Sequence, residues 1–178
     1  LYQVAKENDR KFVIPLRKAH LLNMLRNDPR LKIPDIQKDD TIVFYMKRKK
    51  TGEYQETDYY KWERPFLAKA VTYDYIRKKQ SKVLLNLDLT EFTELIDIKP
   101  LNGGHFIHSM SEPFSEEDVD REVMDRWLSH FGLEFHQIHA SGHCSRTHLK
   151  KIIDKIKPKQ IVPIHTEHPE IFKQIFED

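Results

Sequence analysis

The chain has very little cysteine and no long apolar stretch. One of its 178 residues is a cysteine, Cys144, which excludes an intramolecular disulfide framework and is typical of a reducing intracellular compartment. No apolar run approaches the roughly 20 residues that span a bilayer, and no signal-peptide pattern is present at the N-terminus. With 30 basic and 28 acidic residues, the formal charge of +2 selects no class of partner. We expect a cytoplasmic protein without a membrane partner.

Short β-branched runs alternate with amphipathic ones, as they do in βαβ units. The predicted strands are 11–16, 41–46, 82–87, 104–108, 134–139 and 160–164. The predicted helices are 17–27, 58–79, 90–96, 116–130, 145–157 and 169–176. The sequence therefore predicts an α/β fold with a mainly parallel sheet of about six strands, flanked by helices in a Rossmann-like three-layer arrangement.

Two helix boundaries carry local signals. Gly132 is free to adopt the left-handed conformation and ends the helix before it, while Ser145 is an N-cap residue for the next one. Leu149, Ile152, Ile153 and Ile156 of that next helix share one face. We expect this stripe to be buried.

A basic run at 47–50 is followed by an aromatic segment that includes Tyr54, Tyr59, Tyr60 and Trp62. Lysines and aromatic rings of this kind contact phosphates and stack on bases in nucleic-acid-binding proteins. The alternative is a solvated loop followed by aromatics that pack inward.

Two histidines, His143 and His165, stand at the ends of two apolar runs with one predicted helix between them. The carboxyl ends of neighbouring parallel strands open into the same crevice, so both side chains can reach one ligand or metal. Ser141, Ser145 and the backbone amides that begin the helix form a candidate phosphate cradle. The alternatives are that His165 is a structural residue at a strand end and that the segment around His143 is an ordinary strand–turn–helix cap. Cys144, next to His143, is either a nucleophile or a packing residue.

A second turn rich in hydroxyl groups follows the predicted strand 104–108. Ser109 and Ser111 lie there, ahead of the next predicted helix. This arrangement matches a phosphate-binding strand end, and a plain strand–helix turn would look similar.

Three motifs together resemble the C-terminal half of a β-CASP metallo-β-lactamase-fold nuclease, similar to ribonuclease J and its archaeal relatives. They are Gly-Gly-x-Phe-Ile-x-Ser-x-Ser-Glu-Pro at 103–113, His-Ala-Ser-Gly-His-Cys-Ser at 139–145 and Pro-Ile-His-Thr-Glu-His-Pro at 163–169. The resemblance implies that His143 lies beside the scissile phosphate as a catalytic residue and that His165 is a zinc ligand. It implies phosphate or RNA contacts for His139, Ser141, Gly142 and Ser145, and weaker ones for Ser109 and Ser111.

The chain departs from that family in one large respect. The His-x-His-x-Asp-His signature, which supplies most ligands of the family's two zinc ions, is absent, and so is the acidic motif ahead of the β-CASP region. A zinc ion needs three or four protein ligands, so we expect that this chain alone does not bind the two zinc ions of the parent enzyme, or any zinc, and is inactive. It would be the C-terminal part of a zinc-dependent ribonuclease. The alternatives are a noncatalytic RNA-binding module with the β-CASP fold and an unrelated Rossmann-like enzyme with His143 as a base.

The resemblance also implies a domain division. Residues 1–140 would form the β-CASP domain, and residues 141–178 would return to a metallo-β-lactamase domain that this chain lacks. The strand 160–164 would then have no neighbours, so we expect an exposed apolar patch there. RNA and a second copy of the chain, or another protein that covers this segment, are the expected partners.

Overall fold

The computed structural model describes residues 1–110, 119–138, 144–164, 166 and 168–171, and the chain divides into two compact units. The first unit comprises Leu1–Ile107 and Pro113–His136, and the second comprises His108–Glu112 and Gln137–Asp178. The helices are α1 (Tyr2–Glu7), α2 (Leu16–Leu25), α3 (Tyr73–Lys78), α4 (Glu94–Ile98), α5 (Val119–Phe131) and α6 (Arg146–Ile156). The strands are β1 (Lys11–Pro15), β2 (Ile42–Tyr45), β3 (Ala70–Val71), β4 (Val83–Leu85), β5 (His105–His108) and β6 (Glu134–Gln137).

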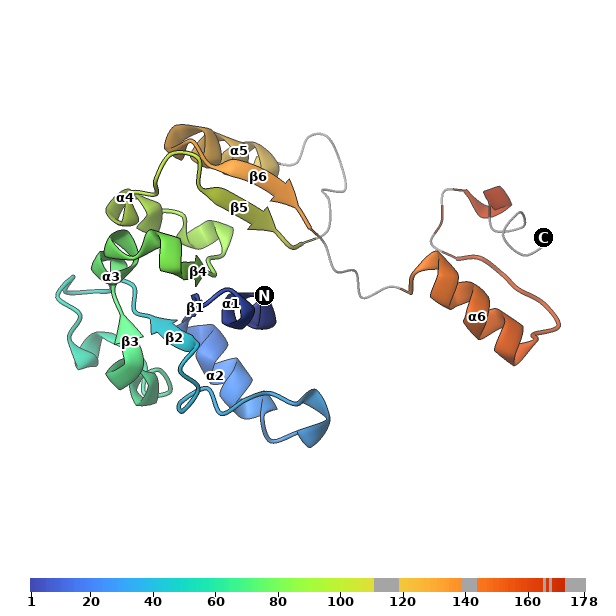
Figure 1. The fold of residues 1–178 in the computed structure, drawn as a ribbon, viewed down its shortest axis with the longest axis horizontal. Coiled ribbons are helices and arrows are strands. Elements are labelled where there is room, and N and C mark those ends of the chain that lie inside the picture. The colour runs from blue at the N-terminus through green and yellow to red at the C-terminus, as the bar shows by residue number, and fades with distance from the viewer. Residues whose placement is uncertain (111–118, 139–143, 165, 167, 172–178) are drawn as a thin grey trace. The chain divides into compact units, whose positions relative to one another are not determined.

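Four parallel strands form the main sheet of the first unit, in the order β3-β2-β1-β4 (Figure 1). The central strand β1 pairs with β2 on one side and with β4 on the other, so that Val13 lies between Val43 and Leu85. Because the central strand is covered on both faces, its residues Val13 and Ile14 are both fully buried.

Successive residues of β1 point into different hydrophobic clusters. Val13 packs with Ile76 of α3 and Leu95 of α4, whereas Ile14 packs with Ala19 of α2 and with Phe66. Since side chains alternate between the two faces of a strand, the sheet has a helical layer on each side. The predicted α/β class and three-layer arrangement are therefore confirmed.

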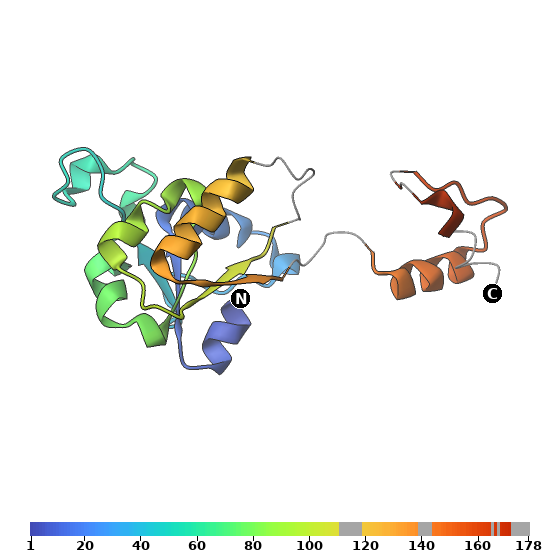
Figure 2. The same ribbon diagram turned by 90° about the horizontal axis from the view of Figure 1, so that it is seen from above.

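A second sheet of two strands, β5 and β6, completes the first unit with α5 between them in sequence (Figure 1). The amide of Glu134 donates to the carbonyl of Gly104 and that of Ile138 to the carbonyl of His108, an equal offset that indicates parallel strands. In both views α5 lies along this pair (Figure 2). Phe106 and Phe135 pack from the strands against the cluster that contains Met124 of α5.

The main sheet has four strands, so the predicted sheet of about six is wrong in number. Strands β5 and β6 form their own sheet, and β3 lies within the segment that was predicted as the helix 58–79. That segment contains Pro65, which occupies the first turn of a 3₁₀ helix. A proline has no amide to donate and clashes with the preceding turn, so one long helix cannot pass through this position.

The second unit contains α6, whose apolar stripe is not buried as predicted. Ile152 and Ile156 are exposed, and no residue of the helix is buried. Residues 160–164 do not form the predicted strand, because a strand requires a neighbour for its amides and carbonyls. Ile161, Val162 and Ile164 are exposed, as expected for an apolar segment without neighbouring strands. None of the described helices combines the length and the apolar character required to cross a membrane.

Candidate functional site

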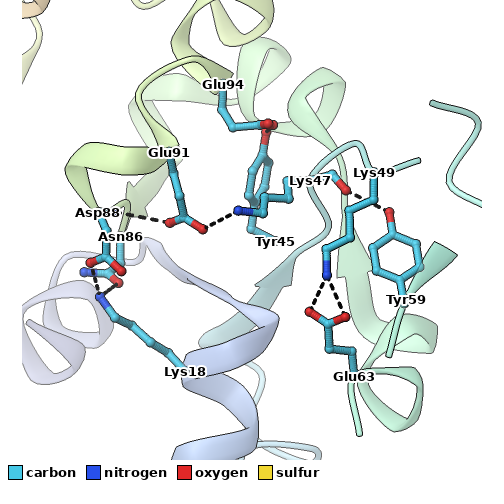
Figure 3. A network of polar contacts seen from close by, with 10 residues as sticks. All are labelled: Lys18, Tyr45, Lys47, Lys49, Tyr59, Glu63, Asn86, Asp88, Glu91 and Glu94. Atoms are coloured by element: carbon cyan, nitrogen blue, oxygen red, sulfur yellow. Dashed lines mark hydrogen bonds and ion pairs between the residues drawn. The ribbon is translucent and has the colours of Figure 1, made fainter. Parts of the chain in front are cut away.

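The carboxyl ends of β1, β2 and β4 lie on one edge of the parallel sheet. The strand order reverses beside β1, and open α/β sheets bind ligands at such a reversal. Lys18 in the first turn of α2 lies there with Asn86 and Asp88, which follow β4 (Figure 3). The Lys18 Nζ donates to Asn86 Oδ1 at 2.6 Å and to Asp88 Oδ1 at 2.9 Å. The lysine at this edge is therefore already neutralised by a carboxylate.

Two further polar contacts extend this edge. Tyr45, the last residue of β2, donates its hydroxyl proton to Glu94 Oε2 at 2.6 Å, and Lys47 Nζ lies 3.2 Å from Glu91 Oε1 (Figure 3). Burial, followed by the hydrogen bond to Glu94, raises the pKa of Tyr45 far above its usual value. Tyr45 therefore stays protonated and is a hydrogen-bond donor.

The basic run 47–50 is not an open phosphate-binding patch. Besides Lys47, Lys49 donates to both carboxylate oxygens of Glu63 at 2.7 and 2.6 Å, and Glu63 is only 4% exposed. Tyr59 is buried and donates its hydroxyl to the Lys47 carbonyl at 2.9 Å (Figure 3). Two of the lysines and this tyrosine thus stabilise the fold, which agrees with the alternative of inward-packing aromatics.

Tyr60 and Trp62 form an exposed pair of stacked rings. Their centroids lie 5.7 Å apart at an interplanar angle of 10°, and Tyr60 is 62% and Trp62 37% exposed. The ring of His20 approaches Trp62 to 5.1 Å, and Lys49 Nζ lies 5.0 Å from the Tyr60 centroid. Exposed aromatic rings of this kind are suited to stacking with nucleic-acid bases.

Most of the site residues predicted from the sequence fall outside the part of the chain that the structure describes. These are His139, Ser141, Gly142, His143, Ser111 and His165. Ser109 follows β5, and Ser145 caps α6 by accepting a hydrogen bond from the His148 amide at 3.3 Å. The predicted N-cap is confirmed, whereas convergence of these residues on a phosphate remains a prediction.

A cluster of ligand-type side chains that the sequence did not predict lies on the β5–β6 sheet. One potential ligand atom each from His105, Glu134 and His136 falls within 4.8 Å of the others. The spacing of Glu134 and His136 is a sequence signal, because alternate residues of a strand share a face. Their proximity to His105 depends on the pairing of β6 with β5, which a single sequence does not reveal.

One comparison with known proteins concerns the C-terminal segment, and another concerns the fold. Residues 131–174 match the family described as the Zn-dependent metallo-hydrolase RNA specificity domain. This match supports a relationship to the metallo-β-lactamase family in the broad sense. No curated protein matches the chain.

One matching solved structure is the crystal structure of a protein of unknown function from Enterococcus faecalis V583. The TM-score is 0.60 and the sequence identity is 24% over 90% of this chain. The chain spans 31% of that protein's length. At this identity the likeness concerns the fold alone.

The described residues do not fit the zinc pair of a metallo-hydrolase. Each zinc ion requires three or four protein ligands, and the described residues contain a single group of three suitable side chains. His165, the one ligand that the family resemblance assigns, lies outside them. A two-zinc reaction centre therefore does not follow from the part of the chain that the structure describes.

Proposed function

We propose that this chain is the RNA-contacting part of a zinc-dependent metallo-hydrolase that cleaves RNA phosphodiesters, of the β-CASP type similar to ribonuclease J. The observation that carries the proposal is the match of residues 131–174 to an RNA specificity domain of zinc-dependent metallo-hydrolases. The segment contains the two histidine motifs at 139–145 and 163–169. In this proposal residues 1–140 are the β-CASP domain, residues 141–178 return to the metal-binding domain, and the enzyme is cytoplasmic.

The proposed roles differ between the two motif histidines. His143 contacts the scissile phosphate, whereas His165 is one ligand of a zinc ion whose other ligands this chain does not supply. Ser141, Gly142 and the backbone that leads to the Ser145 cap bind the phosphate, with His139, Ser109 and Ser111 around it. The N-terminus of α6 supports this role, because its amides and the helix dipole favour an anion.

Substitution of the two histidines in the whole enzyme tests these roles. We expect His165→Ala to lower both the zinc content and RNA hydrolysis, since a ligand is lost. His143→Ala is expected to lower turnover while the zinc content stays unchanged, and His130→Ala, at an exposed histidine outside both motifs, is the control. Hydrolysis that survives both substitutions would contradict the proposal.

A second candidate function is a noncatalytic RNA-binding module. The match to an RNA specificity domain and the exposed rings of Tyr60 and Trp62 suit RNA binding without requiring hydrolysis. The two proposals differ in whether the natural gene product carries that signature upstream of Leu1, which mass spectrometry of the natural protein determines. RNA binding without hydrolysis in a natural product that lacks the signature would select the module.

The exposed apolar residues of the second unit suggest a contact surface for another protein or a second copy. Ile156, Val162 and Ile164 are each at least 65% exposed. Isolated domains rarely leave several large aliphatic side chains uncovered along one segment.

A further inference from the structure

The solvent-facing side of the β5–β6 sheet carries His105, Glu134 and His136. Exposure alternates along both strands: these three side chains are exposed, whereas Phe106 and Phe135 pack against the core. The Glu134 amide donates to the Gly104 carbonyl at 2.7 Å, which places Glu134 beside His105 on the neighbouring strand. One strand thus contributes two of the three side chains, and its neighbour contributes the third.

The three ligand atoms lie at separations that a single metal ion requires. His105 Nδ1 is 3.0 Å from His136 Nε2 and 3.1 Å from Glu134 Oε2, and the last two atoms are 3.8 Å apart. Ligand atoms at about 2.0–2.1 Å from a tetrahedral zinc ion are separated from each other by about 3.3 Å. The observed separations lie on both sides of this value, so an ion fits between the side chains with small rotamer adjustments.

The geometry points to a zinc site formed by His105, Glu134 and His136, with a water molecule as the fourth ligand. Two imidazole nitrogens and one carboxylate oxygen are suited to zinc, whereas calcium and magnesium prefer oxygen ligands alone. Without an ion, a hydrogen bond between His105 and His136 requires a proton on one ring nitrogen of the pair. Zinc would replace this hydrogen bond, with each neutral ring binding through one nitrogen and keeping its proton on the other.

The strands hold the ligands in place before the ion binds. Phe106 packs edge-on against Phe92 at 5.5 Å and stacks with Phe135 at 6.3 Å, which fixes the inner side of both strands. The amide of Gly103 donates to the carbonyl of Gly132 at 2.8 Å and joins the turns that precede the two strands. The bound ion would tie β5 to β6, the strands that lead into Ser109 and into residues 139–143.

Glu134 and His136 lie within the matched segment 131–174, and His105 lies within the motif at 103–113, but the proposed RNA function assigns no role to any of the three. A variant of the motif histidine His165 therefore tests the proposed RNA function separately from the zinc site on the β5–β6 sheet. His130, an exposed histidine at the end of α5, provides a control outside both groups.

Titration of the metal-free full chain with Zn²⁺ against a chromogenic chelator tests the site. We expect one tight equivalent in the wild type, a Kd raised at least about 100-fold in His105→Ala and in His136→Ala, and a smaller increase in Glu134→Gln. His130→Ala and His165→Ala are expected to retain the tight equivalent. Circular dichroism of each variant checks that the fold is intact, and the isosteric Glu134→Gln keeps the site testable if a histidine variant unfolds.

Two outcomes would overturn the zinc site. The first is a wild-type chain that binds no equivalent tightly. The second is a tight equivalent that is unchanged in His105→Ala and Glu134→Gln but lost in His165→Ala, which would assign the ion to the motif histidine.

Discussion

Lys49 and Glu63 form the most buried ion pair among the described residues, with side-chain exposures of 19% and 5%. The Tyr60 amide donates a further hydrogen bond to Glu63 Oε2 at 2.9 Å. A buried carboxylate needs such partners, because removal from water costs several kcal/mol per ion. This pair explains why the basic run 47–50 contributes to stability instead of presenting a row of lysines to solvent.

Replacement of Lys49 by methionine tests the role of this pair. Lys49→Met leaves the carboxylate of Glu63 buried without its cation, so we expect the free energy of unfolding to fall by about 3 kcal/mol. The exposed helical pair Asp74–Lys78 is the control, and Lys78→Met should cost at most about 0.5 kcal/mol. Urea unfolding measures both changes. Equal losses of unfolding free energy in the two variants would indicate that the burial of Glu63 does not increase the contribution of its ion pair to stability.

Tyr45 makes a contribution to stability that depends on pH. Burial and the hydrogen bond to Glu94 raise its pKa above the usual 10.0, so the folded chain holds the phenolic proton more tightly than the unfolded chain does. The stabilisation is complete below pH 10 and is lost as the pH rises further, because the unfolded tyrosine then ionises.

The variant Tyr45→Phe reveals this dependence. We expect it to be about 1–2 kcal/mol less stable than the wild type at neutral pH, since a buried hydrogen bond to a carboxylate is lost. The difference should be constant up to about pH 9 and should narrow as the pH rises above about 10, measured by urea unfolding at each pH. A difference that stays constant above about pH 10 would show that the proton of Tyr45 is not held more tightly in the folded chain.

At the scale of elements, Gly132 joins α5 to β6 in a conformation that other residues rarely adopt. Its φ is +62°, and a Cβ atom there would overlap the side chain of Asn102. Gly103, which precedes β5, also has a positive φ of +79°, but a Cβ atom there would meet nothing within 4 Å. A side chain at position 103 would therefore add backbone strain alone, whereas a side chain at position 132 would add both backbone strain and a steric clash.

Alanine substitution at both glycines gives the expected difference. Gly103→Ala should cost about 1 kcal/mol of unfolding free energy for the left-handed backbone alone. Gly132→Ala should cost at least as much, because the exposed side chain of Asn102 must also rotate away. Thermal unfolding of the two variants provides the comparison, and a larger loss for Gly103→Ala would contradict this account of the turn.

Elements with strong local signals were predicted correctly from the sequence. β1 and β2 contain β-branched residues that are buried on both faces, and Ser145 marks the start of α6. β3 has two residues inside an aromatic segment, too few to form a pattern. Residues 160–164 have the composition of a strand, but a strand forms only where a neighbour accepts its hydrogen bonds.

The pairing of elements with one another could not be predicted from the sequence. The division of the strands into sheets of four and two depends on which strands pair, and a single sequence does not encode this in any local pattern. The same limit concealed the cluster of His105, Glu134 and His136, of which only the alternation of Glu134 and His136 is visible along the chain. It also concealed the ion pairs that neutralise Lys47 and Lys49.

At the scale of the whole molecule, the two units contribute different features to the proposed function. The first unit has a packed core on both faces of its sheet, and it presents the stacked rings of Tyr60 and Trp62 to solvent. The second unit carries α6 and an exposed apolar segment, and most of the residues matched by the RNA specificity domain lie in it. The stacked rings and the match to an RNA specificity domain both support RNA as the proposed ligand of the chain.

Binding of single-stranded RNA by the chain alone tests the proposed function most directly. We expect the fluorescence anisotropy of a labelled RNA to show saturable binding that weakens roughly tenfold between about 50 and 200 mM salt, because bound phosphates release counterions. Tyr60→Ala should weaken binding about fivefold or more, whereas Tyr60→Phe should retain it, since a base stacks on the ring. Absence of saturable binding by the folded wild-type chain at low salt would contradict the proposed function.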